Sequence, residues 1–209
     1  MKVISLIGQK GGTGKTTLAE ILAVSFHSEG YETLGIDLDP QTSLSTWGDM
    51  REAQDPRISS APYSRIKQTL EFAKGEGVEV VIIDTAGRAE IGGKSAAENS
   101  DLVILPFQPT SADLMTVSGA QDTIQLAKSP EHFAVLTRVK PQGTRHLETM
   151  DFLKVRGIAV CPHTIGDRVT YQDAAACGLV PSEYELGGKA ALESINVYKY
   201  TLHKLGMKG

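Results

Sequence analysis

The chain has 209 residues, 41% of them hydrophobic and 22% charged, which suffices for a packed globular core. Its two cysteines exclude a disulfide scaffold and fit a reducing cytoplasm. The sequence contains no run of 18 apolar residues, so no membrane-spanning helix is predicted. The net charge of -4 indicates that the molecule as a whole is not a polyanion-binding protein. Residues 189–209, however, carry four lysines against one glutamate, which permits a local basic face.

Short apolar runs alternate with segments of helical periodicity along the chain. Strands are predicted at Val3–Ile7, Thr33–Asp37, Val78–Asp84, Leu102–Phe107 and Phe133–Thr137. Helices are predicted at Thr16–Glu29, Ser64–Lys74, Ala112–Ala127, Thr170–Cys177 and Lys189–Leu205, with a polar stretch at residues 55–62. Because the strands are apolar throughout, they indicate a parallel sheet covered on both faces. The predicted fold class is α/β, one doubly wound, mostly parallel sheet in a single domain spanning residues 1–209.

A glycine-rich segment, Gly8-Gln9-Lys10-Gly11-Gly12-Thr13-Gly14-Lys15-Thr16-Thr17, joins the first strand to the first helix. The glycines let successive backbone N–H groups point inward as an anion site, and the helix adds the positive end of its dipole. Lys15 is expected to reach the β- and γ-phosphates, and the Thr16 hydroxyl to bind Mg²⁺. Residues 10–17 are therefore predicted to bind a nucleotide.

This loop departs from the common phosphate-binding pattern, because Gln9 stands where a glycine is expected six positions before Lys15. A second lysine, Lys10, lies five positions before Lys15. Two neighbouring cations repel each other unless the anionic charge is large, so Lys10 is not expected to be idle. The loop resembles the deviant Walker A motif of the ParA/MinD family, Lys-Gly-Gly-x-Gly-Lys-[Ser/Thr]. That resemblance implies that Lys10 reaches the partner's phosphates across a nucleotide-sandwich dimer.

Two aspartates follow the second predicted strand, at the edge where open parallel sheets bind ligands. Asp37 and Asp39 are two residues apart, which puts their side chains on one side, and Pro40 ends the strand. Residues 37–41, Asp-Leu-Asp-Pro-Gln, are similar to a motif of the ParA group. The similarity implies that Asp39 is catalytic, orienting or activating the attacking water, and that Asp37 supports Mg²⁺ through water. Asp39, Pro40 and Gln41 then form a switch segment.

Asp84 ends the most hydrophobic predicted strand, an arrangement typical of a Walker B carboxylate that serves the outer shell of a metal ion. The continuation, Thr85-Ala86-Gly87-Arg88, resembles signal-recognition-particle GTPases, a related branch. In either branch a glycine at Gly87 can turn its N–H towards a γ-phosphate as a switch.

The base is predicted to be adenine. The GTPases of that branch pair guanine with an aspartate after a later strand, and Leu136–Lys140 contains no aspartate at the corresponding place. ATP is therefore favoured over GTP. Predicted neighbours of the adenine are Thr137, Arg138 and Pro162.

The resemblance to ParA proteins extends to Leu105–Thr110 and Arg168–Gly178, and so over nearly the whole chain. The short start resembles small plasmid-type ParA proteins, which lack a separate N-terminal DNA-reading domain. The resemblance implies an ATP- and Mg²⁺-dependent homodimer, cytoplasmic and nucleoid-associated, that binds DNA without sequence preference. A centromere-binding or adaptor protein would stimulate hydrolysis and release. Because such DNA binding rests on phosphate contacts, the candidate residues are basic: Arg168, Lys189, Lys199 and Lys204.

Three other functions stay open. A related ATPase could position another cargo on the nucleoid, which the sequence does not separate from partition. A MinD-like membrane switch needs a C-terminal amphipathic helix, and residues 203–209 are too short and glycine-broken for one, so no membrane partner is expected. An ATP-dependent amidoligase of the same superfamily would not need Lys10. The five histidines show no metal-ligand spacing, and zinc is not expected.

Overall fold

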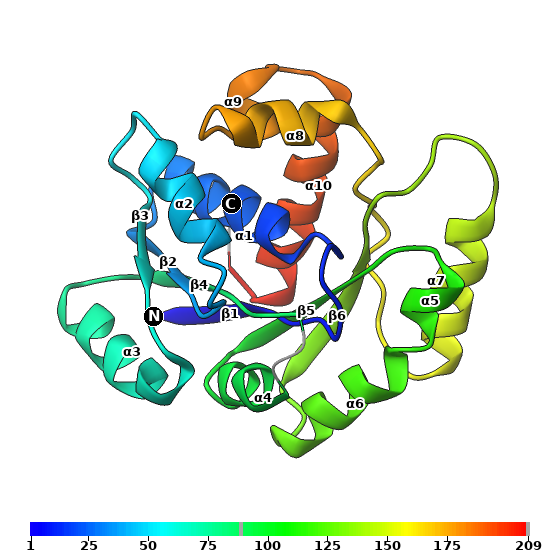
Figure 1. The fold of residues 1–209 in the computed structure, drawn as a ribbon, viewed down its shortest axis with the longest axis horizontal. Coiled ribbons are helices and arrows are strands. Elements are labelled where there is room, and N and C mark those ends of the chain that lie inside the picture. The colour runs from blue at the N-terminus through cyan, green and yellow to red at the C-terminus, as the bar shows by residue number, and fades with distance from the viewer. Residues whose placement is uncertain (88–89, 208–209) are drawn as a thin grey trace.

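The computed structural model describes residues 1–87 and 90–207, and its centre is a six-stranded sheet with helices on both faces (Figure 1). Within these residues the strand pairings are all parallel, in the order β3-β2-β4-β1-β5-β6. The strands are β1 Lys2–Leu6, β2 Thr33–Asp37, β3 Arg57–Ser60, β4 Val80–Asp84, β5 Leu102–Phe107 and β6 Glu131–Leu136. The predicted α/β class with a parallel, doubly wound sheet is confirmed.

Two helical layers cover the sheet (Figure 1). One contains α1 Lys15–Ser28, α2 Ser43–Met50, α8 Val169–Ala176, α9 Pro181–Tyr184 and α10 Lys189–Lys204. The other contains α3 Ile66–Gly75, α4 Glu90–Glu98, α5 Ser111–Leu114, α6 Val117–Leu126 and α7 Arg145–Val155, and a 3₁₀ turn at Tyr63–Arg65 precedes α3. Ile82 packs into the core of the first layer and Ile83 into that of the second. Burial on both sides is why β4 is apolar at successive positions.

Several elements carry no strong sequence signal. The strand β3 lies in the polar stretch 55–62, and three of its four residues are exposed because it is an edge strand. The helices α2, α4 and α7 were likewise not among the predicted elements. The predicted helix Ala112–Ala127 is wrong as a single helix, because the chain breaks between α5 and α6. There Thr116 donates both its N–H and its hydroxyl to the carbonyl of Asp113.

Strand register brings the candidate residues to one edge. Leu6 of β1 and Asp37 of β2 both pair with Asp84 of β4, so these three strands end level with one another. The loops that follow them are the glycine-rich segment, residues 38–42 and residues 85–89. Of these, residues 88 and 89 lie outside the described part. Within the described ranges, none of the helices has both the length and the apolar character needed to cross a membrane.

Candidate functional site

The glycine-rich segment forms a tight loop between β1 and α1. Gly12 and Gly14 have φ of +78° and +88°, a backbone region that strains residues with a side chain, which explains both glycines. Lys15 begins α1 and is only 6% exposed, and its Nζ donates to the carbonyl oxygen of Lys10 at 3.1 Å. Burial lowers the pKa of Lys15, while the charges of Asp84 and Asp39 oppose that shift. The ammonium is therefore held inside the curl of the loop, where it can meet phosphate.

Gln9, the departure from the usual pattern, has a structural role. Its Nε2 donates to the carbonyl oxygen of Gly119 at 3.1 Å and to Oγ1 of Thr123 at 3.0 Å, both in α6. A glycine at this position would lack these bonds. Gln9 thus fixes the outer side of the loop to a helix of the second layer.

Lys10 lies at the rim of the same loop. Its Nζ is 3.4 Å from Oδ1 of Asp113, and the side chains of Lys10 and Asp113 are 44% and 3% exposed. The other oxygen of Asp113 accepts the backbone N–H of Gln108 at 2.8 Å. The predicted site residues did not include Asp113. The segment similar to ParA proteins ends just before it, and that proximity was the available signal.

Asp84 is fully buried at the end of β4, as predicted for a Walker B carboxylate. Its Oδ2 accepts the hydroxyl of Thr16 at 2.6 Å, while its Oδ1 is buried without a hydrogen-bond partner. Burial raises the pKa of Asp84 to about 7, although the hydrogen bond from Thr16 opposes the shift. An unsatisfied buried carboxylate oxygen is costly, so this position favours binding of a cation or a hydrated cation.

Asp37 and Asp39 differ in environment. Asp37 is buried, and its two carboxylate oxygens accept the N–H groups of Asp39 and Ser45, each at 2.9 Å. Because Ser45 is in the first turn of α2, Asp37 also caps that helix. Asp39 is partly exposed, and its Oδ1 accepts the N–H of Gln41 at 2.9 Å. Asp37 therefore fixes the segment that presents Asp39.

These oxygen groups fit Mg²⁺. The hydroxyl of Thr16 points its proton at Asp84 and keeps its lone pairs free, and Mg²⁺ prefers hydroxyl and carboxylate oxygens. In the described part of the chain, no three His, Cys, Asp or Glu side chains are grouped closely enough to hold a metal by themselves. Nucleotide phosphates and water would therefore complete the coordination.

Gly87 touches the phosphate loop. A Cβ on Gly87 would lie 2.6 Å from the backbone nitrogen of Gly11 and 2.7 Å from the carbonyl carbon of Lys10. Only glycine allows so close an approach of two backbones. The structure thus places the predicted switch glycine against the loop, whereas its neighbour Arg88 lies outside the described residues.

An open pocket of about 900 Å³ lies over the loop. Its lining contains Lys10, Gly11, Gly12, Gly14, Lys15, Thr16, Thr17, Asp39, Pro40, Gln41, Ser43, Ala86, Gly87 and Arg138. The structure thus brings together most of the residues predicted to bind phosphate and to form the switch. Asp37 and Asp84 lie beneath this lining, where their side chains are buried.

A smaller hollow of about 50 Å³ adjoins Gly14. Thr137, one of its lining residues, is buried and donates its hydroxyl to the carbonyl oxygen of Thr13 at 2.7 Å. Arg138 also lines this hollow, whereas Pro162 is exposed and lines neither it nor the larger pocket. Residues 165–168 line it too. The sequence predicted no base contact for any of them, and it predicted DNA binding for Arg168.

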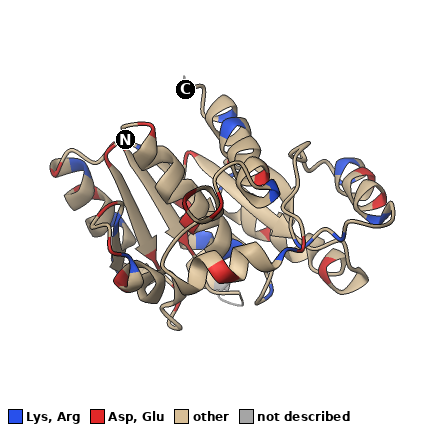
Figure 2. Cartoon of the chain, turned by 90° about the horizontal axis from the view of Figure 1, so that it is seen from above, with Lys and Arg blue, Asp and Glu red and all other residues tan. Residues whose placement is uncertain are grey.

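The four basic residues predicted to bind DNA differ in how free they are. Arg168 forms an ion pair of 2.6 Å with Glu193, and Lys204 forms one of 3.2 Å with Glu131. Lys189 and Lys199 are exposed on α10 and form no ion pair within the described ranges. Free positive charge among the four therefore resides on Lys189 and Lys199 of α10, the helix that ends near the label C in Figure 2.

A parallel sheet, a phosphate loop with two lysines after its first strand and carboxylates at neighbouring strand ends define a P-loop nucleotide-binding protein of the deviant Walker A class. Residues 4–181 match the family model of the CobQ/CobB/MinD/ParA nucleotide binding domain. The chain belongs to this family, and the predicted resemblance is confirmed. ParA and MinD proteins are ATPases, so the chain is a ParA/MinD-type ATPase.

Similar proteins include two curated relatives and a solved structure. Protein ParA of Rhizobium radiobacter is 30% identical over 155 residues, which cover 70% of this chain and 68% of that protein. Maintenance of carboxysome distribution protein A of Gloeobacter kilaueensis is 28% identical over 215 residues, covering 98% of this chain and 94% of that protein. The fold is similar to the septum site-determining protein MinD of Pyrococcus horikoshii, complexed with Mg-ADP. Its TM-score is 0.78 at 18% identity, covering 96% of this chain and 95% of the other.

Proposed function

We propose that this protein is a Mg²⁺-dependent ATP switch for DNA partition. In the ATP state it forms a homodimer on DNA, and hydrolysis releases it. The observation that carries the proposal is the convergence of Lys10, Lys15 and Asp39 on one open pocket. A single phosphate site needs one lysine, whereas the second suits a dimer in which two highly charged triphosphates face each other.

Within one subunit, each group has a defined task. Lys15 and the backbone N–H groups of residues 11–16 bind the phosphates, and the start of α1 adds its dipole. Thr16 and Asp84, with Asp37 through water, hold Mg²⁺, which when bound neutralises phosphate charge. Asp39 orients the attacking water, because its carboxylate lies at the pocket on the segment that Asp37 fixes.

Lys10 acts in the partner subunit. Its side chain is half-exposed at the rim and bonded to Asp113, so it can leave that carboxylate without breaking buried packing. Exchange of the Asp113 contact for the more highly charged triphosphate of the partner favours the dimer. Hydrolysis removes the γ-phosphate, and the gain from Lys10 then falls.

DNA is the proposed surface on which the dimer acts, in the cytoplasm and on the nucleoid. Lys189 and Lys199 are exposed on α10, together with Asn196 and His203, so this helix presents polar groups to a partner. Lys and Arg side chains bind the phosphate backbone of DNA whatever its base sequence. Within the described ranges Leu192 is the one exposed large hydrophobic side chain of α10, so this mostly polar face also favours DNA over a lipid surface. A centromere-binding or adaptor protein would stimulate hydrolysis and release of the dimer from DNA.

Positioning of another cargo on DNA is the second candidate. The observation in its favour is similarity over 98% of this chain to a protein named for carboxysome distribution. The two candidates share the ATP switch and the DNA contact and differ in the adaptor. Fluorescent fusion of the protein distinguishes them: patterns that follow a plasmid support partition, whereas patterns that follow another particle support positioning.

DNA binding by the purified protein tests the shared switch. Random-sequence duplex DNA should bind with ATP and Mg²⁺ and bind far more weakly with ADP or without nucleotide. Affinity in the ATP state should fall by tenfold or more from about 50 to about 200 mM salt, because phosphate contacts release counterions. Binding that is indifferent to nucleotide, or that survives this rise in salt unchanged, would contradict the proposal.

A further inference from the structure

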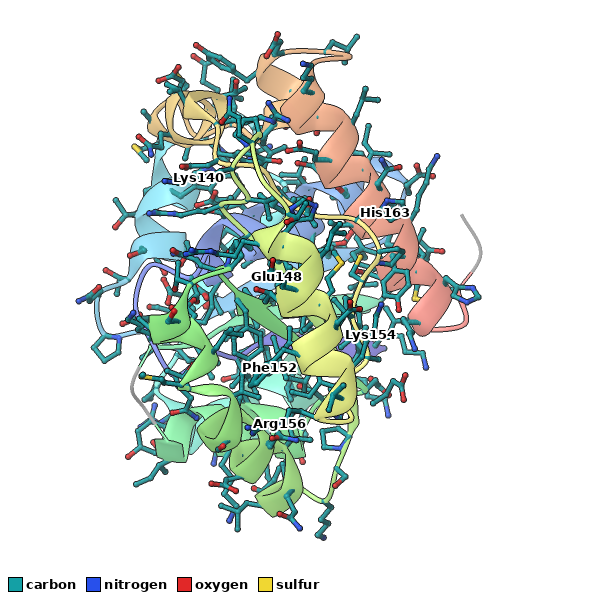
Figure 3. The ribbon with its side chains drawn as sticks, turned by 90° about the vertical axis from the view of Figure 1, so that its right-hand side faces the viewer. Lys140, Glu148, Phe152, Lys154, Arg156 and His163 are labelled. Carbon is teal, nitrogen blue, oxygen red and sulfur yellow. The ribbon has the colours of Figure 1, made fainter. Side chains whose placement is uncertain are left out.

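We propose that the segment between β6 and α7 is a DNA-phosphate site that adjoins the nucleotide pocket. Its cations are Arg138, Lys140 and Arg145, and we call them the loop cations. This inference rests on the proposed function and adds a specific contact surface to it, distinct from Arg168 and the lysines of α10. Figure 3 shows Lys140 above the start of α7, on the face along which Lys154 and Arg156 also lie.

The loop cations surround a hollow of their own. All three line an open pocket of about 680 Å³ between the end of β5 and the start of α7. All three are exposed, and residues 140–145 form an uninterrupted exposed run. The base of this run is anchored, because the N–H of Val139 donates to Ile165 and the N–H of Asp167 donates back to Val139. The cations are thus presented to solvent from a fixed support.

The charge of these residues is available. Within the described ranges, none of the loop cations forms an ion pair, and Glu148 and Asp167 are the acidic side chains that line the pocket. Three cations against two carboxylates leave a positive excess. Arg168, in contrast, is neutralised by Glu193. Free charge that can bind phosphate is therefore found in this loop as well as on α10.

The start of α7 adds to this field. The helix is 11 residues long, begins at Arg145 and has no side-chain cap from Thr144. Arg145, His146 and Glu148 are the pocket-lining residues of its first turn. The N–H groups of Leu147 and Glu148 donate to the carbonyl oxygen of Thr144, so the partial positive charge of the helix start comes from the N–H groups that precede them. They reinforce a site that the three side chains already define.

Arg138 connects this pocket to the nucleotide. It lines the 680 Å³ pocket, the pocket over the phosphate loop and the hollow beside Gly14. Its φ of +49° is strained for a residue with a long side chain, and such strain is typical of functional positions. A nucleotide in the neighbouring pocket would restrict Arg138. ATP can therefore influence the DNA contact within one subunit, besides its effect on the dimer.

The lining favours a phosphate backbone over other polyanions. Among its residues Pro109 and Val139 are the apolar ones, so an acidic protein segment would find little to anchor an apolar side chain. His146 provides the one aromatic ring in that lining, and stacking of bases needs aromatic faces. Contacts to phosphate with few contacts to bases give binding without sequence preference.

A charge-matched pair of double variants tests the proposal. In Lys140→Gln with Arg145→Gln, two loop cations are removed and side-chain length is kept. The control is Lys67→Gln with Lys74→Gln, which removes two positive charges from exposed lysines of α3, on the opposite side of the molecule from α7 in Figure 1. DNA affinity with ATP and Mg²⁺ is measured as a function of salt, and nucleotide affinity and dimer formation are measured in parallel.

The loop variant should bind DNA about tenfold more weakly or worse at about 100 mM salt. Its slope of log affinity against log salt should shrink by about 2, because two phosphate contacts are lost. The control should keep the slope of the parent, and both variants should retain nucleotide affinity and dimerisation. Parent protein that binds no DNA would contradict the proposed function itself.

Three results would overturn the loop site while leaving the proposed function intact. One is a loop variant whose DNA affinity and salt slope equal those of the control. Another is loss of ATP-dependent dimerisation in the loop variant, which would assign the loop to the subunit contact. The third is normal DNA binding with loss of stimulation by a partner protein, which would assign the loop to that protein.

Discussion

Lys10 and Asp113 are 103 positions apart in sequence, yet the ammonium of Lys10 lies 3.4 Å from a carboxylate oxygen of Asp113. The carboxylate is almost fully buried, whereas the lysine is half-exposed. The second lysine of the phosphate loop is thus engaged within its own subunit. For Lys10 to serve a partner subunit, this contact must be exchanged for one with phosphate.

Asp113→Asn should therefore favour the dimer. The amide keeps the approximate shape of the carboxylate and can still accept the N–H of Gln108, but it no longer attracts Lys10 electrostatically. A pair with a half-exposed lysine contributes up to about 1 kcal/mol, and each dimer exchanges two such pairs, so the ATP-dependent dimer should form at up to about thirtyfold lower protein concentration. Sedimentation velocity with ATP and Mg²⁺ measures this. Glu98→Gln, which disrupts the surface pair with Lys94, is the control; equal dimerisation of both variants would refute the exchange.

Gly87→Ala should weaken nucleotide binding by tenfold or more. The added Cβ would meet the backbone of Lys10 and Gly11 at 2.6–2.7 Å, so either the switch segment or the phosphate loop must move. Titration with a fluorescent ATP analogue measures the loss, and circular dichroism shows whether the fold is kept. Gly75→Ala is the matched control, because a Cβ there has no atom within 4 Å. Parental affinity in Gly87→Ala would mean that the close approach has no part in binding.

Glu20 predicts a pH dependence of stability. Burial, assisted by the charge of Asp84 and opposed by Arg51, raises the pKa of Glu20 from 4.5 to about 8. Between these values the folded protein holds a proton that the unfolded chain has lost. This contribution is therefore fully present below pH 4.5 and is lost as pH rises through 8. Asp84, with its pKa raised to about 7, acts in the same direction.

Glu20→Gln should accordingly reduce the loss of folding stability as pH rises. Relative to the parent, its free energy of unfolding should rise from pH 5 to pH 8, by a few kcal/mol at most. Urea unfolding at several pH values, with EDTA and without nucleotide, measures the difference. Curves for parent and variant that stay parallel over this range would show that the carboxyl of Glu20 does not titrate as described.

Arg51 fastens the helix after the switch segment to α9. Its guanidinium forms two hydrogen bonds to Glu183, at 2.8 and 3.0 Å, and lies 4.9 Å from the ring centroid of Trp47. Arg51 is only 8% exposed, so Glu183→Ala would leave a buried charge without its partner. We expect a loss of about 2–4 kcal/mol in urea unfolding. A loss below about 0.5 kcal/mol would show that the pair contributes little to stability.

The parts of the fold that the sequence predicts well are those with a local physical signal. Continuous apolar runs mark β4 and β5 because helices bury both sides of these strands. Glycines at positions 12 and 14 predict a turn because glycine adopts positive φ without strain. The burial of Asp84 follows from its place at the end of β4. In each case the cause lies within a few residues of the effect.

The features that sequence reasoning missed depend on distant partners. The edge strand β3 is held by pairing with β2 and has no apolar run of its own. The sequence does not show that Glu193 neutralises Arg168 or that Asp113 engages Lys10. It also gives no sign that Pro162 lies outside both pockets, since chain direction after β6 decides its position.

Sedimentation velocity of three proteins with ATP and Mg²⁺ tests the central claim, that one loop binds triphosphate and supplies a cation to a second subunit. The parent should form a dimer that declines as ATP is consumed. Asp39→Ala should remain a dimer, because hydrolysis is blocked, and Lys10→Ala should remain a monomer although it still binds ATP. A stable dimer in Lys10→Ala together with a monomer in Asp39→Ala would contradict both assignments.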